Sequence, residues 1–138
     1  MAEEESTCGR GLAENAGVPA GLAVVAVGLA QNLEVHLRAL DPGDAAAAQE
    51  QGVYARVAHS LRSAAADLQA AAAEMASAVD LPMGAHDMAA ITTSDALGAF
   101  EGYVAAEDDL RRLLDARRED DEQMLTAIRA EVERPDAS

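Results

Sequence analysis

The sequence predicts an all-α fold: an elongated bundle of three main helices that includes a long antiparallel hairpin. Three observations indicate this. Alanine, the strongest helix former, supplies 34 of the 138 residues. Hydrophobic side chains recur every three or four residues over long stretches, which is the spacing of one helix face. Proline, glycine and aspartate interrupt these stretches at few places, so we expect helices over about 19–40, 44–79 and 95–132.

The first helix is expected to begin near Pro19, because proline suits the first turn, and to end before Asp41-Pro42-Gly43. Its apolar stripe consists of Leu22, Val25, Leu29, Leu33, His36, Leu37 and Leu40. Residues 1–17 are polar and show no periodicity, which predicts a flexible acidic tail. Residues 18–134 are expected to form one helical-bundle domain, followed by a disordered C-terminus at 135–138.

The second helix is expected to begin at Asp44, a good N-cap, and has a regular heptad pattern. Large residues fall seven apart at Tyr54, Leu61, Leu68 and Met75. A complementary set, mostly alanine, consists of Ala58, Ala65, Ala72 and Val79. The small set would let a neighbouring helix approach closely.

Residues 80–93 are expected to form a loop, because Leu81-Pro-Met-Gly84 breaks the helix and Thr92-Thr-Ser94 offers N-caps for the next one. The third helix then has a first apolar stripe at Leu97, Phe100, Val104, Leu110 and Leu114. A second stripe follows at Met124, Leu125, Ile128 and Val132. Between them, residues 115–123 are too highly charged to face a dry core.

The expected helices differ in length, which predicts self-association. At 1.5 Å per residue the second and third would be roughly 54 and 57 Å long and the first only about 34 Å. One short helix cannot cover so long a hairpin, and a homodimer would complete the bundle. The residues expected to make interhelical or intermolecular contacts are Tyr54, Leu61, Leu68, Met75, Phe100, Tyr103, Met124, Leu125 and Ile128.

The charge balance excludes several partners. The net charge is −15 and the sequence pI is near 4.3, so nucleic acids and anionic membrane surfaces would repel the protein. The most apolar window, 18–30, is too short for a membrane span, and the acidic N-terminus is unlike a signal peptide, so we expect a cytoplasmic protein without membrane insertion. Cys8 is the single cysteine, which excludes an internal disulfide.

His59 is the first candidate for chemistry. The segment Tyr54-Ala-Arg-Val-Ala-His-Ser-Leu-Arg-Ser-Ala-Ala resembles the phosphoacceptor helix of histidine phosphotransfer domains and of histidine-kinase dimerisation domains. The heptad pattern places His59 outside the seam. The resemblance implies that His59 would accept a phosphoryl group and that Arg62, one turn away, would stabilise the added charge.

A carboxylate-bridged metal site is the second candidate, because acidic helical bundles often hold one. Such sites need Glu-x-x-His, and the sequence has no such motif. The remaining weak candidates for metal ligands are His36, His86, Asp87 and Glu107. We therefore expect no bound metal and no cofactor.

A third candidate is export. Phe100-Glu-Gly102 and Tyr103-Val-Ala-Ala-Glu107 resemble the turn motif and the export signal of small helical-hairpin proteins secreted by type VII systems. That resemblance implies an exported protein without a cleavable signal peptide, with Tyr103 and Glu107 as its signal.

The leading prediction is a non-catalytic helical interaction or adaptor protein that forms a homodimer and docks a protein partner. The sequence has no glycine-rich phosphate loop and no nucleophile elbow, which gives little support to an enzyme. Phosphotransfer at His59 and type VII export remain the two alternatives.

Overall fold

A computed structural model describes residues 9–40, 43, 45–82 and 84–134, and the side chains of these residues except 45–47. In this part of the chain the regular structure is entirely helical. The elements in order are α2 (Arg10–Glu14), α3 (Gly17–Ala39), α4 (Ala45–Ser77), the 3-10 turn η1 (Ala78–Asp80) and α5 (His86–Glu133). The predicted all-α bundle of three main helices is confirmed.

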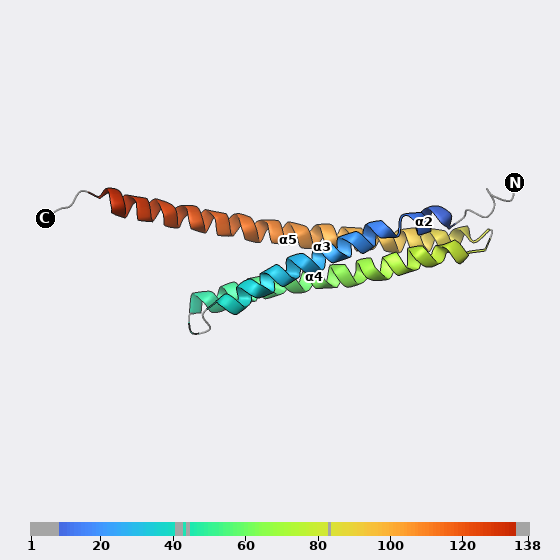
Figure 1. Ribbon diagram of the computed structural model, residues 1–138, viewed down its shortest axis with the longest axis horizontal. Helices are drawn as coiled ribbons and strands as arrows, with labels where there is room; N and C mark the ends of the chain where they lie inside the picture. Colours follow the sequence, from blue (N-terminus) through green and yellow to red (C-terminus); the bar gives the residue numbers. More distant parts are fainter. Residues whose placement is uncertain (1–8, 41–42, 44, 83, 135–138) are drawn as a thin grey trace.

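Helix α4 is the central element of the bundle. Helices α3 and α5 both pack along it, whereas they scarcely contact each other. The chain reverses direction between α3 and α4 and again between α4 and α5, so α4 and α5 form the long antiparallel hairpin that the sequence predicts (Figure 1). The C-terminal part of α5 extends well past the ends of the other helices (Figure 1).

Helix α3 packs through small side chains. Its buried residues are Pro19, Ala23, Ala26, Ala30 and Leu33. Four leucines of the expected stripe flank this row and are only partly buried: Leu22, Leu29, Leu37 and Leu40. The buried face of α3 is therefore centred on the alanines and not on the leucine stripe. Val25 and His36 are exposed, and their placement in the stripe was wrong. Alanine allows close approach to α4, which moves larger residues to the edges of the contact.

Helix α4 has the expected heptad. Tyr54, Leu61, Leu68 and Met75 are all buried, and Ala58 and Ala65 are buried beside them. Ala72 is partly buried, and Val79 is 59% exposed, which corrects the last position of the alanine set. Val79 departs because η1 has replaced the α-helix there, and a 3-10 turn advances each residue by a larger angle.

Helix α5 begins nine residues earlier than expected, at His86 instead of Asp95. The expected loop over 80–93 was therefore wrong from residue 86 onward. Gly84 has φ +86° and completes the turn, and neither proline nor glycine follows it before Gly98. The Thr93 hydroxyl donates to the Ala89 carbonyl at 2.9 Å, so it bonds back within the helix instead of capping a new one.

The buried face of α5 also differs from the expected stripe. We call this face the inner seam: it consists of Thr92, Ala96, Ala99, Tyr103, Ala106 and Leu110, which alternate spacings of four and three residues. Leu97, Val104 and Leu114 are 57%, 64% and 53% exposed, and their assignment to the core was wrong. The inner seam lies one residue, or about 100°, away from them. The large residues of α4 fill the contact, so small residues suit the facing side of α5.

The N-terminal region contains structure where a tail was expected. Helix α2 packs near η1, and Gly9 lies against Ala78 so closely that a Cβ at Gly9 would come within 1.8 Å of the Ala78 carbonyl oxygen. Only a glycine fits at that contact. The other residues of the expected tail, 1–8, lie outside the described residues, as do Asp44 and 135–138.

Candidate interaction surfaces

Beyond Arg117, α5 packs against no other helix of the described chain. Every residue from 114 to 134 is exposed. We call residues 118–133 the α5 extension, which is about 24 Å long. Figure 1 shows this segment projecting alone beyond the N-terminal end of α4.

The α5 extension exposes large apolar side chains. Met124, Leu125, Ile128 and Val132 are 63%, 58%, 52% and 78% exposed. Contiguous exposed apolar residues on a soluble helix usually mark a contact site for another protein. This is the second apolar stripe expected from the sequence.

A longer heptad pattern, apolar at both ends and charged in the middle, connects Leu125, Ile128 and Val132 with the exposed residues nearer the start of α5. We call it the outer row, and it alternates spacings of three and four residues from Leu97 to Val132. Its members are Leu97, Phe100, Val104, Glu107, Arg111, Leu114, Arg118, Asp121, Leu125, Ile128 and Val132. This is the repeat of a coiled-coil seam. Phe100 is partly buried against the core, and Glu107 is partly buried, while the other members are exposed.

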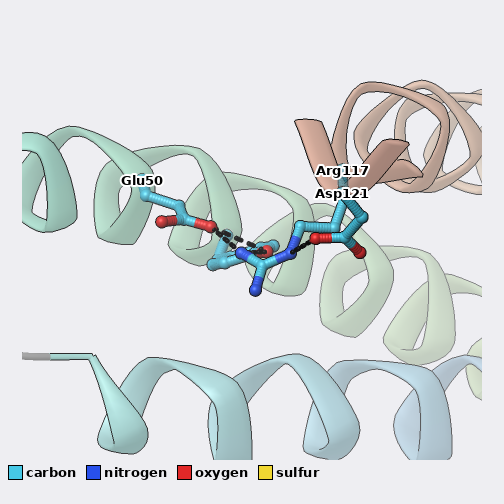
Figure 2. Close-up of polar contacts among 4 residues, drawn as sticks. Glu50, Arg117 and Asp121 are labelled. Carbon is cyan, nitrogen blue, oxygen red and sulfur yellow. Dashed lines mark hydrogen bonds and ion pairs between the residues drawn. The ribbon is translucent and has the colours of Figure 1, made fainter. Parts of the chain in front are cut away.

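The contact between α4 and α5 ends in a polar cluster. Leu113 occupies the next position of the inner seam and is partly buried, and Arg117 occupies the position after it. Its guanidinium contacts the Glu50 carboxylate and the Tyr54 hydroxyl on α4, the latter at 3.4 Å, and its Nε lies 3.7 Å from Asp121 (Figure 2). The Tyr54 hydroxyl donates to Glu50 Oε1 at 3.1 Å. At this end of the α4–α5 contact, an ion pair and hydrogen bonds take the place of apolar packing.

Burial raises the pKa of the Tyr54 phenol, and its hydrogen bond to Glu50 raises that pKa further, while the charge of Arg117 lowers it. Tyrosine with a raised pKa stays neutral at ordinary pH. The Tyr54 phenol is therefore not an activated nucleophile or base, and the cluster lies at the end of the α4–α5 contact.

The candidate phosphoacceptor pair is only partly assembled. His59 is exposed on α4, as the heptad predicts. Arg62, however, forms an ion pair with Glu34 of α3, with Nε 3.0 Å from Glu34 Oε1. The guanidinium thus joins two helices. Sequence reasoning missed Glu34 in this role, because the pairing depends on the relative register of two helices.

The weak metal candidates lie apart. His36 stacks on Tyr54 near the end of α3, with ring centroids 6.3 Å apart, whereas His86 and Asp87 lie at the opposite end of the bundle (Figure 1). Glu107 is midway along α5 and pairs with Arg111 at 3.0 Å. Among the described residues there is no group of three or more His, Cys, Asp or Glu side chains that could hold a metal ion.

The export motif lies within the middle of α5. Tyr103 is a core residue and is only 8% exposed. Burial raises the pKa of its phenol, and the interaction with Glu107 raises that pKa further.

The nine residues expected to make interhelical or intermolecular contacts fall into three groups. Tyr54, Leu61, Leu68, Met75 and Tyr103 pack inside the chain, Phe100 is partly buried, and Met124, Leu125 and Ile128 are exposed.

A further exposed apolar surface lies on α3, where Val18, Val24, Val25 and Val35 are about half exposed or more. The stretch Arg10–Ala39 that includes α3 is long and apolar enough, by length and composition alone, to cross a membrane. Core helices of soluble proteins and signal sequences meet the same criterion.

Fold and surfaces together define an all-α helical bundle with exposed apolar faces. Comparisons of the chain with protein-family models, curated proteins and solved structures gave no significant match.

Proposed function

We propose that this chain is a non-catalytic helical interaction protein that self-associates and docks a protein partner. The α5 extension is the observation that carries the proposal. It places 16 residues of helix, with four large apolar side chains, where no other described part of the chain covers them.

The stability of an isolated helix supports this proposal. A single helix of about 15 residues is marginal in water, because most helical stability in proteins comes from packing. Covering a large aliphatic side chain fully contributes roughly 1.5–3 kcal/mol. The four apolar residues are about half exposed or more, so each would gain a substantial part of that amount on association. A packed neighbour would therefore stabilise the extension.

Charge indicates the kind of protein partner. The net charge of −15 disfavours polyanions, whereas it favours a basic or a complementary helical surface. Residues 119–122 of the α5 extension are four consecutive acidic side chains, all exposed. Apolar residues beside such a charged stretch suit a helix that carries both an apolar stripe and basic flanks.

Light scattering after size exclusion tests the proposal. The wild-type protein should be larger than a monomer at micromolar concentration. Leu125→Gln/Ile128→Gln should shift it toward monomer, because glutamine keeps helix propensity while removing apolar surface. The matched control is Thr126→Gln/Ala130→Gln, which changes the opposite face of the same segment and should leave the mass unchanged. A wild-type monomer that keeps its helicity on dilution would contradict self-association.

Phosphotransfer at His59 is the second candidate, because its imidazole is exposed on a bundle helix. Incubation with acetyl phosphate and intact mass spectrometry tests it, with His59→Gln as the control. Transfer predicts an added phosphoryl group that His59→Gln lacks. The pairing of Arg62 with Glu34 makes us favour the non-catalytic function, and burial of Tyr103 gives little support to export.

A further inference from the structure

The outer row of α5 has a symmetric distribution of chemistry. Its N-terminal end is apolar at Leu97, Phe100 and Val104, and its C-terminal end is apolar at Leu125, Ile128 and Val132. Its middle carries both signs of charge, at Glu107, Arg111, Arg118 and Asp121. Helix α4 occupies the inner seam instead, so the outer row is available to a second helix.

We propose that two copies of this chain associate through their outer rows, with the α5 helices antiparallel and Leu97 of each copy opposite Ile128 of the other. The proposal rests on the self-association proposed above and specifies its surface, direction and register. In this register Phe100 lies opposite Leu125 of the second copy. The two-fold symmetry repeats both contacts, so Leu97 and Phe100 of each copy cover Ile128 and Leu125 of the other.

Charge favours the antiparallel direction. In a parallel pair in register, each charged position would face its own copy, which brings like charges together. In the proposed arrangement Glu107 faces Arg118 of the second copy, and this opposite-charge layer occurs twice. Arg118 makes no ion pair among the described residues, while Glu107 forms an ion pair with Arg111 and interacts with Tyr103 on its own helix.

The arrangement also explains the position of two basic residues. Arg111 and Arg118 lie at the middle of the outer row. Since each chain carries a net charge of −15, two copies repel each other except where such basic residues face acidic ones. The two antiparallel copies cross at the middle of α5, so opposite charges reduce the repulsion between the copies there. Arg111 faces Leu114, and the aliphatic stem of the arginine can contact the leucine. Val104 faces Asp121 at the edge of the charged region.

A slide by one heptad is the main competing register. It would place Phe100 opposite Val132, Val104 opposite Ile128 and Arg111 opposite Asp121, but it would leave Leu97 uncovered and set Glu107 against Leu125. The proposed register sets Val104 against Asp121 and Val132 against Thr93, but it gives an apolar partner to each of the larger side chains, Leu97, Phe100, Leu125 and Ile128, and it pairs Glu107 with a cation. We therefore favour it over the slid register.

Disulfide trapping tests the register. In a Cys8→Ser background, Leu97→Cys/Ile128→Cys places two thiols about 46 Å apart within one helix, so they can join only between chains. Both positions are exposed, at 57% and 52%, so the variant should fold. Mild oxidation should convert it to a covalent dimer. Val104→Cys/Ile128→Cys, one heptad away, and Ile128→Cys alone are the matched controls and should remain mostly monomeric on a non-reducing gel.

Each outcome has a defined consequence. Trapping through Val104→Cys/Ile128→Cys would overturn the register in favour of the slid one, and trapping of Ile128→Cys alone would indicate a parallel pair. No trapping in a protein that light scattering shows to be a dimer would overturn the α5 surface and leave self-association standing. A protein that is monomeric throughout would remove the proposed function itself.

A charge exchange gives an independent readout. Arg118→Glu places two acidic layers in the interface and should raise the dimer dissociation constant at least tenfold, since like charges facing each other are costly. Glu107→Arg/Arg118→Glu should recover most of the affinity. Arg112→Glu makes the same charge change on the opposite face of α5, beside Asp108, and should have a much smaller effect. Equal weakening by Arg118→Glu and Arg112→Glu would overturn the proposed pairing.

Discussion

The contact between α4 and α5 can be tested by enlarging one alanine. Ala106 lies in the inner seam and is only 3% exposed, whereas its neighbour Ala105 is exposed. Ala106→Leu would insert three additional carbon atoms into a packed contact between two helices. Overpacking of this kind costs typically about 1–3 kcal/mol. Ala105→Leu makes the identical change at the preceding residue and should alter the free energy of unfolding by less than about 0.5 kcal/mol.

The assay is urea unfolding followed by circular dichroism at 222 nm, at one fixed protein concentration. For a chain of this length, a loss of 2 kcal/mol corresponds to a melting temperature lower by roughly 6–10 °C. Thermal unfolding therefore gives a second measurement. Working at fixed concentration keeps any contribution of association the same for both variants.

The result also discriminates between two faces of α5. If the stripe expected from the sequence, with Leu97 and Val104 inward, were the buried one, Ala106 would point to solvent. Ala106→Leu would then be tolerated. Equal stability of Ala106→Leu and Ala105→Leu would refute the inner seam, because it would mean that no helix packs against position 106.

Three further predictions follow from the core and the polar cluster. Leu61→Ala should lower the free energy of unfolding by about 2–5 kcal/mol in denaturant titrations, because Leu61 is fully buried, and a loss under 1 kcal/mol would argue against its central position. Arg117→Ala should cost no more than about 1 kcal/mol, because its ion pairs with Glu50 and Asp121 are half exposed; a larger loss would show that the cluster is a principal stabilising contact. The two tyrosines, Tyr54 and Tyr103, should titrate above pH 10 in the folded protein by ultraviolet absorbance, since burial raises both pKa values. The unfolded chain loses its phenolic protons first, so this contribution to stability is complete below about pH 10 and declines as the pH rises further; native titration at the unfolded midpoint would contradict it.

Sequence patterns located α4 well and located the buried face of α5 poorly, for one physical reason. On α4 the largest side chains, such as Leu61 and Leu68, point to the core, so hydrophobic periodicity follows burial. On α5 the inner seam is mostly alanine, while larger residues such as Leu97 and Val104 face outward. Periodicity detects the row with the greatest contrast in side-chain size and polarity, which on α5 is the outer row.

The start of α5 and the contacts between helices were also beyond local patterns. The cluster at Thr92-Thr-Ser94 resembles an N-cap, but Thr92 is buried in the inner seam, so tertiary packing overrides the local signal. The pairs between Arg62 and Glu34 and between Arg117 and Glu50 join residues 28 and 67 positions apart. Their formation depends on how far each helix slides along its neighbour, which no short segment encodes.

Helices α4 and α5 differ in how many of their sides have a neighbouring helix in the described chain. Helix α4 is buried over a broad arc that includes Val57, Ala58 and Leu61, and it has a helix on each side. Helix α5 likewise has two rows with coiled-coil spacing, the inner seam and the outer row, about 100° apart. Its inner seam has a neighbour in α4, and its outer row has none within the described chain. Apolar residues at heptad spacing are costly to leave in water at both ends of this row, and together with the opposite charges at its middle they support the proposed association with another copy of α5.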